Sequence, residues 1–361
     1  MSKLDNRLNH RQLSCLTIDV EDWFHILDSS ATPSIERWSS LESRIERNLE
    51  RLLTLLDTYS VKVTFFWLGW LAEQHKNLVR RCQNAGHEIA SHGYAHVLAY
   101  EVGEKAFRQD ITRAKAVLED IIGEAVRGFR APGFSITKEA VWAFDVIAES
   151  GYQYDSSIFP TLRGHGGMSD SPLGLYFIKT RSDHLLEIPM SIIEILGSRK
   201  SLFGGGYLRL ANKLMINWGI HRLHTTGLPL IVYVHPREID SGQPHLSLTL
   251  MRRFKYYVKL NSTLPKLKWL CKNYSFCTML EMVEGYVRSF YLERRIIPVV
   301  RFRGSQVAIE RLPALEVLTP PANREAFRTR LLLVEKAMAD FLSPRISAHT
   351  KQRRNTANAI L

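Results

Sequence analysis

The sequence Ser91-His92-Gly93-Tyr94-Ala95-His96, which directly follows Gly86-His87-Glu88-Ile89-Ala90, decides how the rest of the chain is interpreted. Two histidines four residues apart follow a short apolar run. On one helical turn their imidazoles would lie on the same face and could bind one metal ion. A histidine pair at this spacing also arises by chance, so the pair alone does not identify a metal site. The site also needs a carboxylate ligand from elsewhere in the chain.

A candidate for that carboxylate lies near the start of the chain. Residues 13–20 are predicted to form a short buried strand, and it ends in Asp19-Val20-Glu21-Asp22. Three carboxylates within four residues repel one another, and burying them is costly unless a cation or hydrogen-bond donors compensate. The alternative is a solvated loop that caps a helix.

Strands and helices alternate along the chain. We predict strands at 61–68, 87–90, 126–129, 185–191 and 229–234, and helices at 40–60, 78–85, 104–122, 138–150 and 212–223. Residues 248–290 are predicted to form a helix, a strand near 275–278 and a second helix. Such alternation is typical of βα units around a parallel sheet or barrel. In these folds the chemistry gathers at the carboxyl ends of the strands, where Asp19–Asp22, His92–His96 and His235 all fall.

Composition and charge set wide limits on function. The chain has 361 residues, of which 45% are hydrophobic and 23% charged, enough for one large domain with an appendage or for two domains. Its formal net charge of +12 suits nucleic acid, an anionic membrane surface or an acidic polymer. No nucleic-acid motif accompanies this charge, so we expect no nucleic-acid partner.

The cysteines and the first residues bear on location. Cys15, Cys82, Cys271 and Cys277 form no CxxC pair, which is typical of buried thiols in a reducing compartment. The first ten residues are polar and lack a signal-peptide core, and no apolar run is long enough to span a bilayer. These features predict a cytoplasmic protein, with peripheral membrane contact as an option.

Taken in order, several motifs resemble those of a known family. The set is Thr17-Ile18-Asp19 with Glu21-Asp22, Ser91-His92-x-x-x-His96, Arg130-Ala131-Pro132, Asp155-Ser156-Ser157 and Val234-His235. It resembles the five motifs of polysaccharide deacetylases, the NodB-homology superfamily or carbohydrate esterase family four. The longer stretches 19–25, 128–132, 154–160, 203–210 and 235–240 resemble the subgroup encoded with exopolysaccharide and PEP-CTERM/exosortase loci. The resemblance covers about residues 12–290.

The resemblance implies a distorted, incomplete (β/α) barrel that holds a divalent metal, usually zinc, through one carboxylate and two histidines. His92 and His96 correspond to the histidine ligands. The carboxylate is Glu21 or Asp22, because Val20 stands where most members have a second aspartate.

The same resemblance assigns catalytic roles. Asp19 would be the general base and His235 the general acid. Arg130 would orient Asp19, and Asp155 would lie near Arg130 as its partner.

The expected function is hydrolysis of N-acetyl groups on amino sugars of an exopolysaccharide or its precursor. The alternatives are a hydrolase of cyclic amides such as allantoin, because some relatives with spaced carboxylates open small rings, and a sugar-binding protein without catalysis. We expect a tail at 1–12, the deacetylase domain at 13–290 and a basic extension at 291–361. That extension is predicted to hold one amphipathic helix (324–342) and a disordered end, and could contact a membrane, the polysaccharide machinery or neither.

Overall fold

The computed structural model describes residues 14–27, 29–162, 166–292, 296–303, 306–313 and 317–318. The strands are β1 (Ser14–Val20), β2 (Thr64–Trp67), β3 (Glu88–Ser91), β4 (Gly128–Phe129), β5 (Tyr154–Asp155), β6 (Tyr176–Lys179), β7 (His184–Glu187), β8 (Ile192–Ile195), β9 (Ser198–Ser201), β10 (Leu230–Val234), β11 (Ile296–Arg303) and β12 (Gln306–Pro313). The α-helices are α2 (Ile35–Trp38), α3 (Ile45–Thr58), α4 (Gly69–Gln74), α5 (Lys76–Asn84), α6 (Ala99–Ile122), α7 (Trp142–Glu149), α8 (Gly205–Leu210), α9 (Lys213–Thr225), α10 (Leu250–Tyr257), α11 (Thr263–Asn273) and α12 (Met279–Leu292). Short 3₁₀ helices are η1 (Pro132–Phe134), η2 (Lys138–Ala140), η3 (Pro236–Ile239) and η4 (Leu260–Ser262).

One mostly parallel sheet organises the fold. Its strand order is β10-β1-β2-β3-β4-β5-β7-β6-β11-β12, and β8 and β9 form a separate hairpin. The strands from β10 to β7 pair in parallel, β6 is antiparallel to β7, and β12 is antiparallel to β11. Within the described residues β10 and β12 are the two ends of the sheet, so it does not close. This confirms the predicted α/β class and the incomplete barrel.

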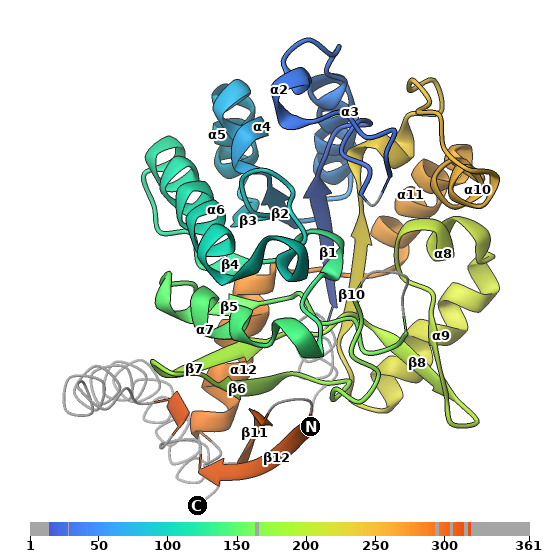
Figure 1. Ribbon diagram of the computed structural model, residues 1–361. Coiled ribbons are helices and arrows are strands. Elements are labelled where there is room, and N and C mark those ends of the chain that lie inside the picture. Colours follow the sequence, from blue (N-terminus) through green and yellow to red (C-terminus); the bar gives the residue numbers. More distant parts are fainter. Residues whose placement is uncertain are drawn as a thin grey trace, which may run out of the picture.

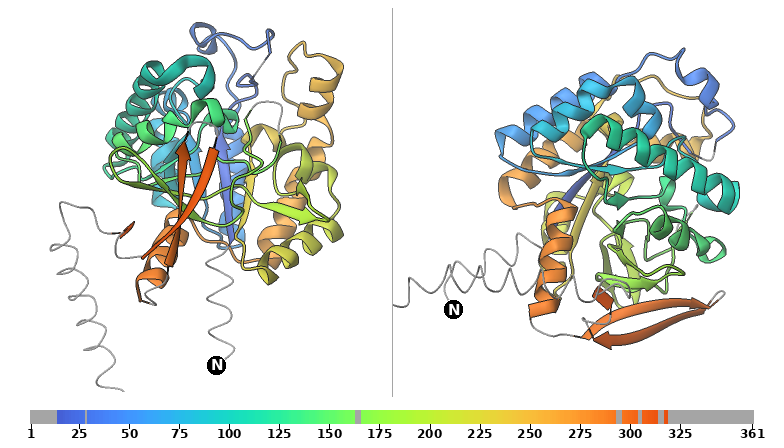
Figure 2. Two further views of the ribbon diagram at one scale, coloured as in Figure 1. Left: turned by 60° about the horizontal axis from the view of Figure 1, so that its bottom comes forward. Right: turned by 90° about the vertical axis from the view of Figure 1, so that its left-hand side faces the viewer.

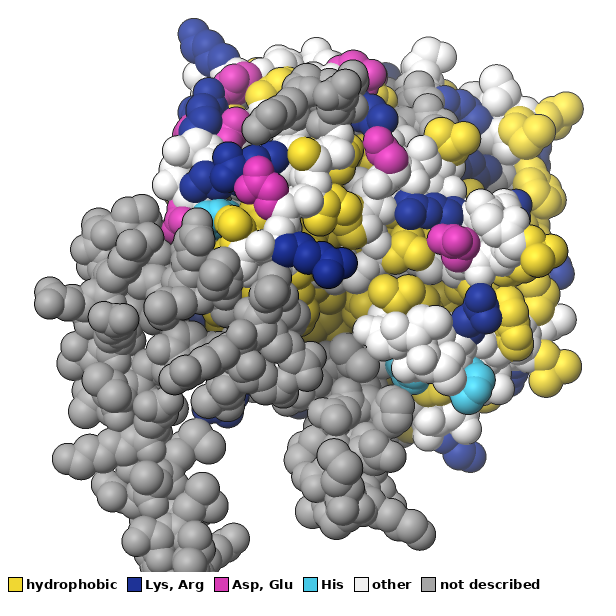
Figure 3. All heavy atoms as spheres, turned by 90° about the horizontal axis from the view of Figure 1, so that it is seen from below, with side chains coloured by type: hydrophobic (Ala, Val, Ile, Leu, Met, Phe, Trp, Pro, Cys, Tyr) yellow, Lys and Arg dark blue, Asp and Glu magenta, His cyan; other side chains and the backbone are white. Residues whose placement is uncertain are grey.

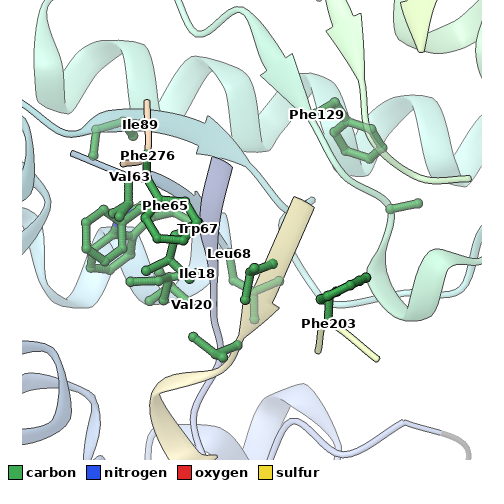
Figure 4. Packing of buried hydrophobic residues seen from close by; sticks show 14 of the residues in the cluster. Ile18, Val20, Val63, Phe65, Trp67, Leu68, Ile89, Phe129, Phe203 and Phe276 are labelled. Atoms are coloured by element: carbon green, nitrogen blue, oxygen red, sulfur yellow. The ribbon is translucent and has the colours of Figure 1, made fainter. Parts of the chain in front are cut away.

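The alternation of side chains along each strand sorts residues between the two faces of the sheet. Ile18 and Val20 of β1 and Phe65 and Trp67 of β2 pack in one hydrophobic cluster, which Figure 4 shows from close by. The intervening residue Phe66 belongs to a second cluster. Asp19 therefore lies on the face opposite to Ile18 and Val20.

The helices cover the first of these faces. Figure 1 shows α4, α5, α6 and α7 in succession around the outside of β2–β5, with α8, α9 and α10 on the opposite side of the molecule. Helix α6 ends at Ile122, where the predicted helix ends, and Gly123 follows in a left-handed conformation (φ 72°) that terminates it. Among the described helices, none combines the length and the apolar character needed to cross a bilayer.

The C-terminal part differs from the prediction. Residues 296–303 and 306–313, which we assigned to an extension outside the domain, form the antiparallel strands β11 and β12, and β11 pairs with β6 of the main sheet. Figure 2 shows this hairpin lying along the edge of the sheet beside α12. The boundary at residue 290 is therefore not a structural boundary. The predicted tail at 1–12 and the predicted helix at 324–342 lie outside the described residues.

Candidate active site

Glu21, His92 and His96 form a cluster that could hold a metal ion. One ligand atom from each lies within 4.8 Å of the others, and all three residues are buried. Oε1 of Glu21 is 3.3 Å from Nε2 of His92 and 3.0 Å from Nε2 of His96. Burial alone would raise the pKa of Glu21, but the nearby imidazoles of His235, His96 and His92 lower it well below its ordinary value. Burial lowers the pKa of His96, which favours the neutral imidazole that a metal requires.

The two histidines meet in a loop and not on the single helical turn considered from the sequence. Gly93 (φ 74°) and His96 (φ 55°) both adopt left-handed conformations after the end of β3. The carboxylate of Asp110 on α6 accepts hydrogen bonds from the backbone amides of Tyr94 and Ala95, at 2.7 and 2.8 Å. A Cβ on residue 93 would lie only 2.7 Å from Oδ2 of Asp110. Glycine at position 93 and Asp110 therefore fix this loop together.

A backbone contact also sets the direction of His92. Its Nδ1 lies 2.7 Å from the carbonyl oxygen of Arg130, which can only accept a hydrogen bond. Nδ1 therefore carries the proton, and the lone pair of Nε2 points toward Glu21.

Asp22, the alternative carboxylate ligand, points elsewhere. Its Oδ2 accepts hydrogen bonds from the Ser43 hydroxyl (2.6 Å) and the Arg44 backbone amide (2.9 Å), and its Oδ1 accepts one from the Trp23 amide (2.8 Å). These contacts secure the start of α3. Burial raises the pKa of Asp22 even though these hydrogen bonds favour the charged form.

Asp19 and Arg130 form a buried ion pair beside the cluster. Nη1 of Arg130 donates to Oδ1 of Asp19 over 2.6 Å and to the Thr17 hydroxyl over 2.8 Å. The same guanidinium donates from Nη2 to the Ser156 hydroxyl and packs on the ring of Phe66. Both terminal nitrogens of the Arg130 guanidinium thus donate hydrogen bonds, so the guanidinium has a fixed orientation. Asp19, its ion-pair partner, is fixed with it.

His235 completes the site from the neighbouring strand. Because Ile18 pairs with Val234, the next residues along β1 and β10 are Asp19 and His235. Nε2 of His235 is 3.9 Å from Oδ2 of Asp19 and 3.5 Å from Oε1 of Glu21. Burial lowers the pKa of His235, but the charges of Glu21 and Glu238 outweigh it and raise the pKa above its ordinary value.

Glu238 holds the imidazole of His235, and Arg209 in turn holds Glu238. Neither role was predicted from the sequence. Oε2 of Glu238 is 3.3 Å from Nδ1 of His235, and Oε1 is 3.2 Å from Nε of Arg209. Burial would raise the pKa of Glu238, but His235, Arg209 and Arg237 lower it to about 2. The sequence signal for the role of Glu238 is its position three residues after His235. A one-turn helix at this point brings the side chain of Glu238 back beside His235.

Asp155 contacts the backbone beside Arg130 through Ser157, and not the Arg130 side chain. Its Oδ1 accepts a hydrogen bond from the Ser157 hydroxyl (2.6 Å), whose oxygen accepts one from the backbone amide of Ala131 (2.8 Å). Asp155 thus supports the backbone next to Arg130, and no ion pair between Asp155 and Arg130 occurs in the described structure. Asp155 also pairs in register with buried Glu187, and burial raises the pKa of Asp155 to about 6.

These groups lie at the floor of a cleft of about 430 Å³. Asp19, Glu21, His92, His96 and His235 all line it. Its other wall comes from α8 and α10, which add hydrophobic and basic side chains. The cleft is large enough for a sugar unit, and its floor combines a metal-binding set with a buried carboxylate and an imidazole.

The fold and these groups define an α/β protein whose cleft holds three residues that could bind a metal ion, beside a buried carboxylate and an imidazole. Residues 38–154 match the family model of polysaccharide deacetylases, and residues 156–284 match a domain of unknown function, DUF3473. The first of these matches and the relatives below show similarity to polysaccharide deacetylases over part of the chain. Asp19 and Glu21 precede the first matched range, and His235 lies within the second.

Relatives resemble this chain over part of their length. A peptidoglycan-N-acetylglucosamine deacetylase of Bacillus cereus is 35% identical over 94 residues, which are 26% of this chain and 34% of that protein. A chitooligosaccharide deacetylase of Azorhizobium caulinodans is 34% identical over 22% of this chain and 38% of that protein. The matched segments thus span between a third and two fifths of these two relatives.

Solved structures share the fold. A protein of Mycobacterium smegmatis assigned as a polysaccharide deacetylase aligns with a TM-score of 0.53 and 21% identity, covering 77% of this chain and 90% of that one. Puue allantoinase aligns with a TM-score of 0.52 and 15% identity, covering 78% and 92%.

Proposed function

We propose that this protein is a metal-dependent hydrolase that removes N-acetyl groups from amino sugars. The observation that carries the proposal is the convergence of Glu21, His92 and His96 on one point of the cleft floor, with Asp19 and His235 beside it. The matches to peptidoglycan and chitooligosaccharide deacetylases support the same chemistry.

The three ligand residues fit a zinc ion. One carboxylate and two imidazoles form a set that zinc accepts in catalytic sites, where a further position stays open for water or substrate. The hydrogen bond from His92 to the Arg130 carbonyl, which leaves Nε2 as the ligand atom, is the outer support that metal-bound histidines usually have. When bound, the ion would polarise the acetamide carbonyl and lower the pKa of a nearby water.

The side chains around the ligands supply the proton transfers. Asp19, held by Arg130, takes a proton from the water as its oxygen bonds to the acetamide carbon. His235 donates a proton to the sugar nitrogen as the carbon–nitrogen bond breaks, so that acetate and a free amine leave. The raised pKa of His235 favours the protonated form that this step needs.

The motif resemblance to the exopolysaccharide-associated subgroup supports an exopolysaccharide or its precursor as the substrate. A second candidate is ring opening of a cyclic amide. It is favoured by the single residue between Asp19 and Glu21, the spaced carboxylate pattern.

One assay separates these functions. Zinc-reconstituted protein is incubated with N-acetylated chito-oligosaccharides and, separately, with allantoin, and free acetate and ring-opened product are measured. Acetate release that is absent from the Glu21→Gln variant supports the deacetylase. Product from allantoin alone supports the second candidate, and inactivity on a panel of acetylated glycans and on allantoin, with zinc bound, supports a binding protein.

A further inference from the structure

Exposed hydrophobic side chains are concentrated on one segment of the chain. Of the thirteen large hydrophobic side chains that are exposed among the described residues, ten fall between residues 195 and 254. Leu214, Leu250 and Met251 are 80%, 85% and 78% exposed, and Leu196 at the β8–β9 turn is fully exposed. An isolated exposed hydrophobic residue needs no explanation, but such a concentration indicates an interaction surface.

The same segment is strongly basic. Residues 195–280 contain thirteen lysines and arginines, and their only acidic residues are Glu238 and Asp240. Both acids are buried, with exposures of 2% and 4%, and both are paired with arginines. The net charge of the segment is therefore +11. The β8–β9 hairpin adds one exposed acidic side chain, Glu194, directly before the segment.

The elements that carry these residues lie on one side of the molecule. Figure 1 and the left view of Figure 2 show α8, α9, α10 and the β8–β9 hairpin on the right-hand side. Figure 3 shows hydrophobic side chains along that edge, with lysine and arginine side chains between them. Arg209 of α8 joins two of these helices by donating to the backbone carbonyls of Lys255 and Tyr256. We call the exposed hydrophobic and basic residues of these elements the apolar-basic face.

The apolar-basic face adjoins the cleft. Tyr207 and Leu210 of α8 and Met251 and Phe254 of α10 are exposed, and all four also line the cleft that holds Glu21 and the histidines. Helix α10 buries none of its side chains against the protein, which is unusual for a helix with an apolar stripe. Leu250, Met251 and Phe254 of this helix are thus available to a partner at the mouth of the site.

We propose that the apolar-basic face docks on an anionic lipid bilayer and presents the mouth of the cleft to the membrane surface. Aliphatic and aromatic side chains insert at the boundary of headgroups and acyl chains, while the lysines and arginines pair with anionic headgroups. Nucleic acid would use the positive charge but would leave Leu214, Leu250 and Met251 without partners. The inference concerns binding and does not depend on the proposed reaction.

Docking on a bilayer restricts which substrates of the proposed reaction reach the cleft. A cleft that opens at a bilayer favours acetylated sugars presented on that surface, such as glycans linked to a lipid, over free oligosaccharides in solution. Failure of vesicle binding would leave the deacetylase assay unaffected, and failure of that assay would leave vesicle binding unaffected.

The test is flotation of the full chain with vesicles of phosphatidylcholine alone or with about 30% phosphatidylglycerol. We expect binding only to the anionic vesicles and a loss of tenfold or more in the Leu214→Ser/Trp218→Ser/Leu250→Ser variant. The matched control, Leu162→Ser/Ile309→Ser, removes exposed hydrophobic side chains outside the face and should bind as the unchanged protein does.

A second pair of variants tests the charge. Lys200→Gln/Lys213→Gln/Arg253→Gln should also lose roughly tenfold or more in partitioning to anionic vesicles. Lys76→Gln/Lys105→Gln, which changes exposed lysines elsewhere, should keep it.

Circular dichroism and size-exclusion chromatography accompany both sets. Absence of binding to anionic vesicles, or equal binding by the face variants, would overturn the proposal. So would a change in oligomeric state of the face variants, which would show that the face joins two copies of the chain.

Discussion

Nη1 of Arg130 donates to Oδ1 of Asp19 over 2.6 Å, and the two side chains are 0% and 2% exposed. This pair leaves Oδ2 of Asp19 directed toward His235 and the cleft. An aspartate held in this way keeps its orientation toward the cleft, which a general base requires.

The first prediction concerns this base. Asp19→Asn should lower turnover by roughly 10²–10⁴-fold, because the amide cannot accept the proton from water. Zinc content, measured by mass spectrometry after dialysis, should be unchanged, because Glu21, His92 and His96 remain. Turnover close to that of the unchanged protein would remove Asp19 from the role of base.

The second prediction decides between the two carboxylates that the sequence left open. Glu21→Gln should abolish stoichiometric zinc binding, because it replaces the charged oxygen nearest both histidines. Asp22→Ala should retain zinc but lower the free energy of unfolding by about 1–2 kcal/mol, because the Ser43 and Arg44 donors at the start of α3 lose their acceptor. Zinc loss in Asp22→Ala with zinc retained in Glu21→Gln would reverse the assignment.

The third prediction concerns the loop that brings the histidines together. Asp110→Ala leaves the amides of Tyr94 and Ala95 without their acceptor, so it should cost about 1–3 kcal/mol of stability and weaken zinc binding. Asp120→Ala, an exposed aspartate on the same helix, is the matched control and should change neither. Chemical unfolding and zinc titration measure the two effects, and an unchanged zinc affinity in Asp110→Ala would show that the loop is fixed by other contacts.

The fourth prediction concerns pH. Burial raises the pKa of Asp155 to about 6, and burial together with the charge of Asp155 raises the pKa of Glu187 well above its ordinary value. The native state therefore binds these protons more tightly than the unfolded chain. The resulting stability is complete below the ordinary carboxyl pKa and is lost as pH rises through the native values.

Glu187→Gln, whose amide replaces the protonated acid, should remove the part of this dependence that Glu187 contributes. The unchanged protein should lose roughly 1–3 kcal/mol relative to the variant between pH 4 and pH 8, measured by urea unfolding. A difference between the two proteins that stays constant across this range would show that protonation of Glu187 does not stabilise the native state.

Much of the fold was predictable because parallel strands buried on both faces have a recognisable apolar sequence. The strands around Ile18, Phe65, Ile89 and Val232 were predicted close to their observed positions, and their carboxyl ends carry the site. The convergence of Asp19 and His235 followed from strand ends alone, because parallel neighbours meet at one edge of a sheet.

Other features depended on contacts that a local pattern does not contain. The choice between Glu21 and Asp22 is made by the turn after β1, which directs one side chain to the histidines and the next to α3. The loop from His92 to His96 depends on Asp110, fourteen residues further along the chain. The pairing of β11 with β6 joins segments about 120 residues apart, so its partner could not be inferred from neighbouring residues.

The β11–β12 hairpin also determines how the chain can be shortened. Without residues 296–313, β6 would present a row of unpaired amides and carbonyls at the sheet margin, and Phe177 and Ile178 would lose the strand that shields them. Such a margin is a template for adding strands from other molecules. A chain cut at residue 290, where the family resemblance ends, would therefore keep every group of the cleft and still self-associate into insoluble material.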